Sequence, residues 1–366
     1  MTVVRIVADD LTGALDAAAP LVGLAGPLPV FWDPQAAGKA GGSFALDSES
    51  RDVPAPAQWF EVLRGADLAY KKIDSLLRGR TVDEIAACLQ SGRFPSAVIA
   101  PAFPAQQRIM RGGRQHWRPG RADPWQPVDV DFMAELRRRG LPVRHASSPQ
   151  DVVGKGFFVC DAETDDDLRA IVRAGQALEG PVLWIGTAGL ARALAGLGSP
   201  APQAALHPPF LLVIGSHHPV TLAQVEQLAA HAPDAIASVQ PDTTDLAAVI
   251  ESLARTLGAR GRAALAFALP DGTGADVAGP LFDRAMALAA GRLEPPRSVA
   301  VTGGATLFRL VRTLGADSLL VEGELMPGIA VSRLQGGRWP GATVISKSGA
   351  FGAPDLLVGW WKRAHA

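Results

Sequence analysis

This 366-residue sequence contains few cysteines and carries almost no net charge. Its two cysteines, Cys88 and Cys160, stand alone without CxxC or Cys/His spacing, which excludes a disulfide framework and a cysteine-based zinc site. Lys and Arg number 35 against 36 Asp and Glu, which gives a formal net charge of -1. Because no global positive field exists, we expect no binding to nucleic acid or to an anionic membrane, and any anion site must be local.

Signal-peptide features and long uninterrupted apolar runs are also missing. The N-terminal apolar run leads directly into Asp9 and Asp10 and has no basic segment before it, so it is not typical of a secretory signal. Prolines interrupt the apolar stretch 17–32, which excludes a continuous membrane helix there. We therefore expect a soluble, cytoplasmic protein.

The composition is that of a globular chain, with 48% hydrophobic and 19% charged residues. Short apolar runs alternate with segments of helical period, which predicts an α/β fold: two domains with largely parallel sheets flanked by helices. The predicted strands are Val3–Ala8, Pro29–Trp32, Ala97–Ala100, Gly156–Cys160, Val182–Ile185, Leu211–Ile214, Ala263–Ala268, Ser298–Thr302, Ser318–Val321 and Thr343–Ser346.

The length of the chain fits two domains, since one domain usually has about 100–200 residues. A proline-rich stretch marks the predicted division, because its prolines favour an extended connector over a helix. We predict an N-terminal domain over 1–198, a linker over 199–209 and a C-terminal domain over 210–366. A second irregular stretch, 107–126, is rich in arginine and lacks a period, which predicts a loop over a site.

Two adjacent carboxylates, Asp9 and Asp10, follow the first predicted strand and precede Thr12 and Gly13. Ligands of open α/β sheets gather at the carboxyl ends of strands, so this position favours a functional role. Neighbouring carboxylates also repel each other unless a cation, a donor or a ligand compensates them. The alternative is that one of the two acids only caps the following helix.

The stretch 70–80 gathers cations, a carboxylate and a hydroxyl where a strand is expected to become a loop. Lys72 and Arg78 are suited to bind a carboxylate or a phosphate, and Asp74 is suited to accept a proton from a substrate hydroxyl. The alternative is a solvated, charged turn.

Three predicted strand ends in the C-terminal half carry glycine. Gly303 and Gly304 separate a strand from a helix, Gly215 and Ser216 follow another strand, and a third strand end holds 347–352 with Lys347 and two glycines. Glycine allows the backbone to approach a phosphate, and a helix N-terminus attracts its charge. The alternative is a set of plain tight turns, but three in one domain favour nucleotide binding.

Two further patterns in the C-terminal half do not indicate a catalytic or binding role. Thr221 with Gln224 has the spacing of a helix capping box. His217 and His218 are adjacent, so in an extended chain they point to opposite sides, and we predict no metal site there. A serine hydrolase is disfavoured because no Gly-x-Ser-x-Gly sequence occurs.

The order of these motifs resembles that of a known family. The N-terminal half has Ala8-Asp9-Asp10-Leu11-Thr12-Gly13-Ala14, Lys71-Lys72-Ile73-Asp74-Ser75 with Leu77-Arg78-Gly79, and Pro101-Ala102-Phe103-Pro104. The C-terminal half has Gly215-Ser216, Thr302-Gly303-Gly304, Met326-Pro327-Gly328 and Lys347-Ser348-Gly349-Ala350-Phe351-Gly352. Over nearly the whole chain, these residues are similar to the four-carbon acid sugar kinases.

The resemblance implies ATP-dependent phosphorylation of a small acid sugar such as threonate, erythronate or 3-oxo-tetronate, with Mg²⁺ arriving with ATP. It implies that the N-terminal domain holds the sugar acid, that the C-terminal domain holds ATP, and that the active site lies in the interdomain cleft. The implied ATP contacts are Ser216, Gly303, Gly304, Ala305, Thr306 and Gly349. The implied substrate-side positions are Asp9, Asp10, Arg51, Lys72, Asp74, Ser75 and Arg78. Asp74 or Asp10 is expected to act on the hydroxyl, and Arg78 on the substrate carboxylate.

Some positions depart from the family pattern. Residues 75–80 are Ser-Leu-Leu-Arg-Gly-Arg where Ser-Thr-Leu-Arg-Gly-Asn is expected, Gln107-Arg108-Ile109 replaces Gly-Arg-Thr, and Ala305 replaces an acidic residue. A sugar-acid or nucleotide binding protein without turnover is therefore the alternative function. An oxidoreductase is disfavoured by the lack of a GxGxxG sequence after a strand. The sequence leaves open which sugar acid is used and whether the chain forms a homo-oligomer.

Overall fold

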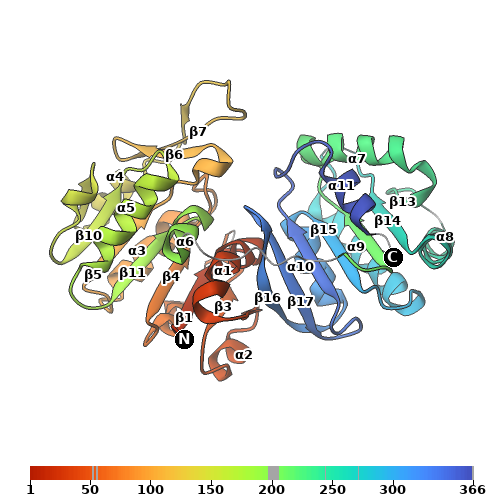
Figure 1. Cartoon of the computed structure of the whole chain (residues 1–366), viewed down its shortest axis with the longest axis horizontal. Coiled ribbons are helices and arrows are strands. Elements are labelled where there is room, and N and C mark those ends of the chain that lie inside the picture. Colours follow the sequence, from red (N-terminus) through yellow and green to blue (C-terminus); the bar gives the residue numbers. More distant parts are fainter. Residues whose placement is uncertain (52, 55–56, 197–205, 244, 271, 365–366) are drawn as a thin grey trace. The chain divides into compact units, whose positions relative to one another are not determined.

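The computed structural model divides the chain into two compact units, Met1–Pro200 and Ala201–Ala366 (Figure 1). It describes all residues except 52, 55–56, 197–205, 244, 271 and 365–366. Most of the linker predicted at 199–209 lies outside the described residues, so its limits stay a prediction. Among the helices that the structure describes, none is long and apolar enough to cross a membrane.

The N-terminal unit is built on a parallel sheet with the strand order β2-β3-β1-β4-β11-β5-β10-β9. Its strands are β1 (Val4–Ala8), β2 (Leu28–Phe31), β3 (Phe44–Asp47), β4 (Leu68–Lys72), β5 (Ser96–Ala100), β9 (Val143–Ala146), β10 (Gly156–Cys160) and β11 (Val182–Gly186). The central strands are buried along their whole length, as expected for a sheet that helices cover on both faces.

Helices connect most of these strands. They are α1 (Leu11–Ala25), α2 (Pro34–Lys39), α3 (Thr81–Gln90), α4 (Phe132–Arg138), α5 (Asp165–Gln176) and α6 (Ala188–Ala195), with the 3₁₀ turns η1 (Ala57–Leu63), η2 (Pro104–Gln106) and η3 (Pro149–Asp151). Helix α6 contacts both α1 and α5, whereas α3 contacts α4 and η1. The two groups therefore form separate layers.

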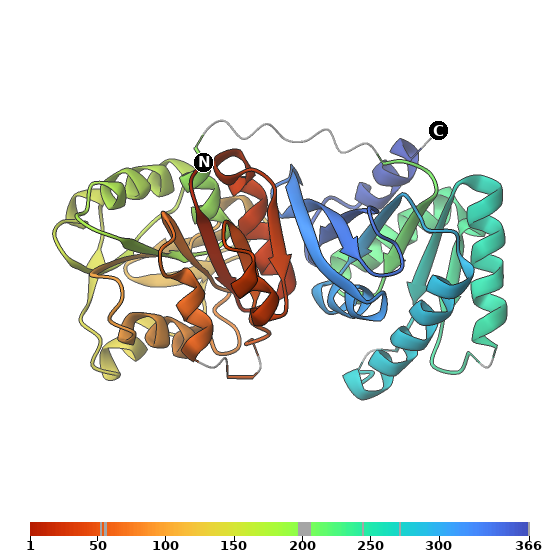
Figure 2. The same cartoon turned by 90° about the horizontal axis from the view of Figure 1, so that it is seen from below.

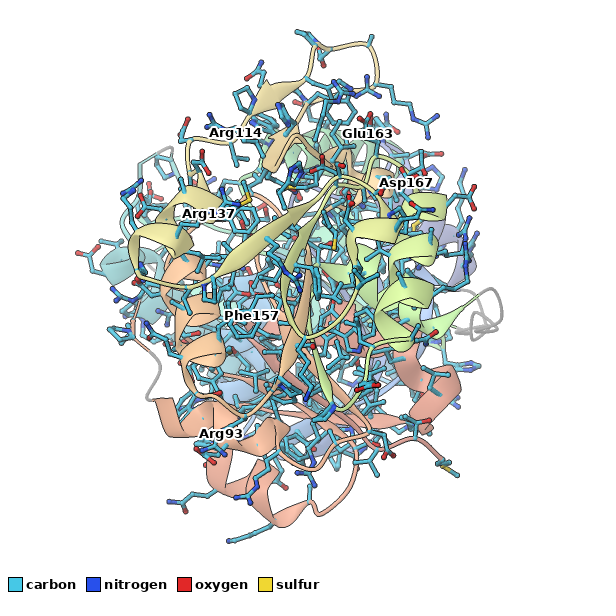
Figure 3. All side chains as sticks on the ribbon, turned by 90° about the vertical axis from the view of Figure 1, so that its left-hand side faces the viewer. Arg93, Arg114, Arg137, Phe157, Glu163 and Asp167 are labelled. Carbon is cyan, nitrogen blue, oxygen red and sulfur yellow. The ribbon has the colours of Figure 1, made fainter. Side chains whose placement is uncertain are left out.

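The stretch predicted as an irregular loop over 107–126 contains the strands of a small antiparallel sheet, so the predicted lack of regular structure is wrong for that part. Its strands are β6 (Arg108–Arg111), β7 (Arg114–Trp117) and β8 (Gln126–Pro127). Single bridges join Arg108 to Phe103 after β5, and Met110 to Ala162 after β10. Figure 3 shows Arg114 and Glu163 at the same end of this unit and Arg93, which precedes β5, at the other. The small sheet thus lies at the carboxyl ends of the parallel strands.

The C-terminal unit has a second sheet with the order β13-β14-β12-β15-β18-β17-β16. Its strands are β12 (Phe210–Ile214), β13 (Ile236–Val239), β14 (Arg262–Phe267), β15 (Ser298–Thr302), β16 (Ala316–Met326), β17 (Ile329–Gly336) and β18 (Thr343–Lys347). Strand β17 runs antiparallel to both β16 and β18, while the other pairs are parallel. The predicted α/β fold with largely parallel sheets is confirmed.

Among the described residues of this unit, five helices and one 3₁₀ turn accompany the sheet. They are α7 (Pro219–His231), α8 (Leu246–Arg260), α9 (Ala275–Arg292), α10 (Gly304–Thr313), α11 (Leu356–Arg363) and η4 (Pro233–Ala235). Helix α7 packs against α11, and a core that includes Phe210, Leu228 and Trp360 fills the space between them and the sheet. Helix α9 contacts both α8 and α10, and α8 and α9 are the teal and cyan helices of Figure 2.

The chain path creates one topological switch point in each sheet. Strand β1 connects through α1 to β2 on one side, whereas its neighbour β4 connects through α3 to β5 on the other. Because such crossovers are right-handed, α1 and α3 lie on opposite faces, and the chain diverges at the carboxyl ends of β1 and β4. By the same reasoning α7 and α10 diverge at the ends of β12 and β15. Ligands of open α/β sheets bind at such positions.

Candidate functional site

Three carboxylates meet one guanidinium at the switch point of the N-terminal unit. Arg51, in the loop after β3, places Nη2 2.8 Å from Asp9 Oδ2 and Nη1 2.8 Å from Asp10 Oδ2. Its Nη2 also lies 3.5 Å from Asp74 Oδ1, which follows β4. Burial opposes the charged form, but the carboxylates of Asp10, Asp9 and Asp74 raise the pKa of Arg51, so it stays protonated. The Arg51 guanidinium therefore links the carboxyl ends of β1, β3 and β4 through ion pairs.

Asp10 combines the two roles that the sequence left as alternatives. Its Oδ1 accepts a hydrogen bond from the Gly13 backbone N–H at 2.7 Å and caps α1, while its Oδ2 faces Arg51 and Thr12. The side chain of Asp10 is 23% exposed, whereas those of Asp9 and Asp74 are 2% and 5% exposed. Asp10 is thus the most accessible carboxylate of this group.

Asp74 is the most heavily hydrogen-bonded of the three. Arg78 contacts it in a bidentate manner, with Nη2 2.6 Å from Oδ1 and Nε 2.9 Å from Oδ2, and the backbone N–H groups of Leu76 and Arg78 also bond to Oδ2. Burial opposes ionisation, but the hydrogen bonds and charge of Arg78, with Arg51 and Lys72, hold the pKa of Asp74 well below its usual range. The Arg78 side chain is 62% exposed, so its outer edge is open to solvent.

The two other predicted substrate-side residues, Lys72 and Ser75, lie next to this group. Lys72 is buried at the end of β4, and its Nζ donates to the Ile73 carbonyl at 2.7 Å. A Cβ built on Gly13 would come 3.0 Å from Lys72 Nζ, so the amine lies against the start of α1. Ser75 is half-buried, and its carbonyl accepts a bond from Gln115 Nε2 at 3.0 Å.

A second set of buried polar groups supports this site, and sequence reasoning missed it. Lys71 Nζ lies 2.9 Å from Glu84 Oε2 on α3, and Ser50, next to Arg51, donates to the other oxygen of Glu84. Asp47 ends β3 opposite Ala8 and accepts a bond from the Glu49 backbone N–H at 2.8 Å. Burial raises the pKa of Asp47 to about 8. None of the predicted strands adjoins these residues, so the sequence pattern gave no signal for this set.

The small antiparallel sheet adds Arg108 and Gln115 to the same end of the unit. Gln115 is fully buried and its Nε2 donates to the carbonyls of Ser75 and Pro101, which fixes the loops after β4 and β5. Burial lowers the pKa of Arg108, while the nearby charge of Asp74 opposes that shift. The Nε of Arg108 has no hydrogen-bond partner among the described residues. Both residues fall in the stretch whose strands were not predicted.

In the C-terminal unit, glycines bring three strand ends into close contact. A Cβ on Gly215 would overlap the Thr306 hydroxyl, and a Cβ on Gly349 would overlap Ser216 Oγ. Gly303 has φ 98°, a left-handed backbone that favours glycine, and a Cβ there would lie 3.2 Å from Ser216 Cβ. These five residues, called the glycine cluster below, follow β12, β15 and β18, the three strand ends at which the sequence carries glycine.

Gly304 and Ala305, the two other residues implied to contact ATP, form the start of α10 directly after Gly303. Ala305 is exposed, and Gly304 is half-buried. The N-terminus of α10 therefore opens at the glycine cluster, where unpaired N–H groups and the helix dipole favour a negative charge. Among the residues that the structure describes, no group of three or more His, Cys, Asp or Glu side chains is arranged to hold a metal ion.

The loop after β18 is shaped from inside by polar side chains. Lys347 Nζ donates to Thr221 Oγ1 at 3.1 Å and to the carbonyls of Ser348 and Phe351 at 3.2 Å each. Thr221 donates to the Gly349 carbonyl at 2.7 Å, and Gln224 Nε2 donates to the Phe351 carbonyl at 3.1 Å. Burial lowers the pKa of Lys347 to about 8.

The capping box predicted from Thr221 and Gln224 is therefore wrong. Helix α7 begins earlier, at Pro219, and its N-cap is His218. Both predicted capping side chains are buried and bond to the loop after β18 instead. Tertiary contacts have thus replaced a local interaction of the same spacing.

The structure is thus a two-unit α/β fold with paired arginines and carboxylates at the switch point of one unit, and glycines with a helix N-terminus at the switch point of the other. Residues 4–129 and 126–194 match the family of sugar-binding N-terminal domains, and residues 211–357 match the family of nucleotide-binding C-terminal domains. The chain belongs to the four-carbon acid sugar kinase family, whose members are phosphotransferases that act on an alcohol group.

Individual relatives are similar to this chain along almost its entire length. The chain is 30% identical to a D-threonate kinase from Cupriavidus necator, with 98% of this chain and 97% of that protein covered. It is also 30% identical to a D-threonate kinase from Bordetella bronchiseptica, with 97% and 96% covered. A crystal structure from Salmonella typhimurium LT2 has the same fold, with a TM-score of 0.72, 20% identity and 99% of each chain covered.

Proposed function

We propose that this protein transfers the terminal phosphoryl group of ATP to a hydroxyl of a four-carbon acid sugar, with D-threonate, erythronate and 3-oxo-tetronate as the first candidates. The N-terminal unit would bind the sugar acid and the C-terminal unit would bind ATP. The observation that carries the proposal is the different chemistry of the two switch points. One holds paired cations and carboxylates, and the other holds glycines and a helix N-terminus.

The accessibility of the carboxylates supports Asp10 as the group that orients or deprotonates the substrate hydroxyl. Asp10 is the most exposed of the three, and a general base must reach the proton that it removes. Both oxygens of Asp74 are already bonded to Arg78 and to backbone N–H groups, so Asp74 is better suited to position Arg78. The exposed edge of Arg78 then suits the carboxylate of the sugar acid.

The glycine cluster supports binding of the nucleotide phosphates. Its residues bring backbone close to any bound group, and the start of α10 supplies N–H donors for an anion. We propose that Ser216, Gly303, Gly304, Ala305, Thr306 and Gly349 contact ATP, and that Mg²⁺ enters with the phosphates as part of the substrate. The cation would neutralise charge on the transferred group.

The first test is ADP release from Mg-ATP in a coupled assay, across four- to six-carbon aldonates and 3-oxo acids. Turnover that requires both ATP and one of these acids would support the proposal and name the substrate. Ligand-dependent thermal stabilisation without ADP release would instead favour a binding protein of the same fold.

The roles of the two carboxylates are separated by single substitutions. Asp10→Asn should lower kcat by about 100-fold or more, as expected for loss of a general base. Asp74→Asn should mainly raise KM for the sugar acid, because Arg78 loses the partner that orients it. Asp83→Asn is the matched control, since Asp83 also pairs with two arginines, Arg80 and Arg139, but is exposed on α3. Unchanged turnover in both test variants would contradict these roles.

A further inference from the structure

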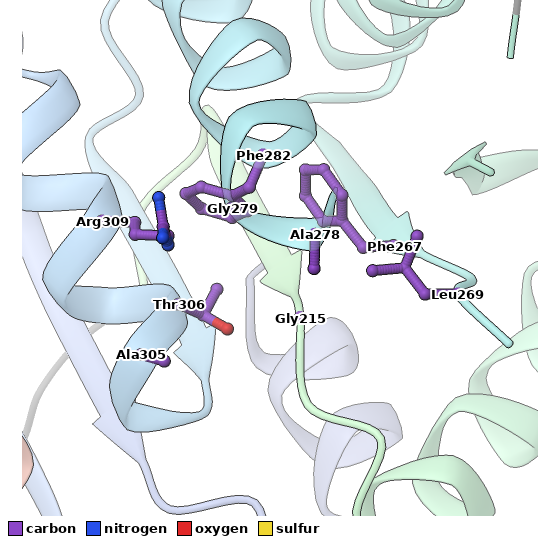
Figure 4. A pocket seen from close by; sticks show the side chains of 9 residues that line it. All are labelled: Gly215, Phe267, Leu269, Ala278, Gly279, Phe282, Ala305, Thr306 and Arg309. Atoms are coloured by element: carbon purple, nitrogen blue, oxygen red, sulfur yellow. The ribbon is translucent and has the colours of Figure 1, made fainter. Parts of the chain in front are cut away.

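A small cavity borders the glycine cluster of the C-terminal unit (Figure 4). Its volume is about 130 Å³, and it is lined by the end of β14, the start of α9 and the first turns of α10. Gly215 and Thr306 belong both to this cavity and to the glycine cluster. A ligand bound at the cluster can therefore extend into the cavity without leaving the site.

The walls of the cavity are mostly apolar and partly aromatic. The rings of Phe267 and Phe282 lie with their centroids 4.7 Å apart and their planes at 40°, and both residues are buried. Among the described residues that line the cavity, Arg309 alone carries a charge. Its Nη1 bonds to Asp283 Oδ2 at 2.7 Å, which fixes the guanidinium at the edge of the cavity. Apolar rings and a fixed guanidinium suit a flat aromatic ligand.

Gly279 on α9 is needed for this arrangement. The guanidinium of Arg309 lies directly against the Gly279 backbone, where a Cβ would overlap both its Nη2 and its Cζ. A larger residue at position 279 would push Arg309 away from α9. The two helices therefore form one wall whose shape depends on a glycine and on an arginine from different elements.

We propose that this cavity, called the base pocket below, receives the purine base of the nucleotide whose phosphates the glycine cluster binds. The proposal rests on the proposed function. The volume is below the about 300–1,000 Å³ of pockets that enclose a whole drug-sized ligand, so it suits one ring system. The ring would lie beside Phe267 and Phe282, and Arg309 would donate to or stack on it.

A larger cavity of about 640 Å³ lies at the ends of β12, β13 and β14 and is the competing location for the base. It includes Ser216 of the glycine cluster and is also lined by Leu222 and Asp242. Among the described residues that line it, no arginine or lysine offsets the carboxylate of Asp242, whereas the carboxylate of Asp283 beside the base pocket is paired with Arg309. The size of the larger cavity also exceeds that of a single ring. The base pocket is therefore favoured, and the larger cavity becomes a distinct outcome of the test.

Calorimetric titration of the full chain with MgADP and with magnesium tripolyphosphate, which has no base, tests the proposal. The wild type should bind MgADP more tightly than tripolyphosphate. Ala278→Leu places extra side chain in the base pocket from a half-buried position on α9, and should weaken MgADP binding at least 10-fold. It should leave tripolyphosphate binding and the KM for the sugar acid unchanged. Leu222→Trp, which fills the larger cavity, is the matched control and should change neither.

The outcomes distinguish failure of the base pocket from failure of the proposed kinase function. If Ala278→Leu binds MgADP like the wild type, or if Leu222→Trp alone weakens it, the base pocket is refuted while the proposed kinase stands. If the wild type binds no nucleotide, the proposed function fails and the base pocket fails with it. Arg309→Met is the second variant should Ala278→Leu not fold, and it should weaken MgADP but not tripolyphosphate, since it removes the guanidinium alone.

Discussion

Replacing Asp47 by asparagine should stabilise this protein, and the gain should increase with pH. Asp47 is 1% exposed at the end of β3, and burial raises its pKa from 3.8 to about 8, with the charges of Asp10, Glu49 and Asp9 adding to the shift. Between about pH 4 and pH 8 the native state therefore keeps a proton that the unfolded chain has lost. Stability supplied by this group falls as the pH rises through that window.

The magnitude follows from the two pKa values. They differ by about four pH units, and each unit corresponds to about 1.4 kcal/mol. The free energy of unfolding should thus lose about 1.4 kcal/mol per pH unit through Asp47, or about 5 kcal/mol in total by pH 8. The asparagine variant keeps an oxygen that can accept the bond from the Glu49 backbone N–H, but it has no ionisable group.

Urea unfolding at pH 5, 6, 7 and 8, followed by tryptophan fluorescence, measures this difference. The stability advantage of Asp47→Asn over the wild type should grow steadily across the series. Asp67→Asn is the control, because Asp67 also accepts a backbone hydrogen bond, from Val3 at 2.8 Å, but is exposed. Parallel pH profiles for the wild type and Asp47→Asn would refute the reasoning, because they would mean that Asp47 ionises alike in both states.

Two further substitutions test the polar groups behind each site. Lys347→Met removes the donor that ties together the loop after β18, so MgADP binding should weaken about 10-fold while the KM for the sugar acid stays unchanged, as titration and steady-state kinetics would show. Glu84→Gln leaves the buried Lys71 without a counter-charge and should lower the free energy of unfolding by about 3–5 kcal/mol in urea titration.

Exposed neighbours serve as controls for both. Lys362→Met removes an exposed lysine from α11 in the same unit as Lys347, and should leave MgADP binding unchanged. Asp83→Asn alters an exposed pair one residue before Glu84 and should cost no more than about 1 kcal/mol. A Glu84→Gln variant as stable as this control would show that Lys71 finds another partner or loses its proton.

Much of the fold was predictable because its central strands are continuous apolar runs. Each of the ten predicted strands overlaps a strand of the structure, and the turn at Gly303 and Gly304 lies where it was expected. Strand β4 was expected only as the strand that ends within 70–80, and its limits were not predicted, because its last residues, Lys71 and Lys72, are charged although they are buried in the structure. A local pattern cannot show that a buried lysine has found a carboxylate on α3.

The candidate site was predictable only in part for the same reason. Asp9 and Asp10 stood out because they follow an apolar run, and Asp74 stood out because cations and a hydroxyl surround it in the sequence. Arg51 was assigned only by resemblance, since no local pattern links it to them. The arrangement depends on the parallel register of β3, β1 and β4, which places the ends of distant segments side by side. The roles of Asp47, Arg108 and Lys347 likewise arise from tertiary contacts.

The pairing of Arg51 and Arg78 has a consequence for affinity. Both guanidiniums already contact carboxylates of the protein, so the proposed sugar acid would have to share or replace a partner. Its binding free energy is then a difference between two ion pairs and not the full value of one. Such an exchange favours weak, rapidly reversible binding. It also favours ligands whose carboxylate and hydroxyl have the right relative positions, so a negative charge alone would gain a competing metabolite little affinity.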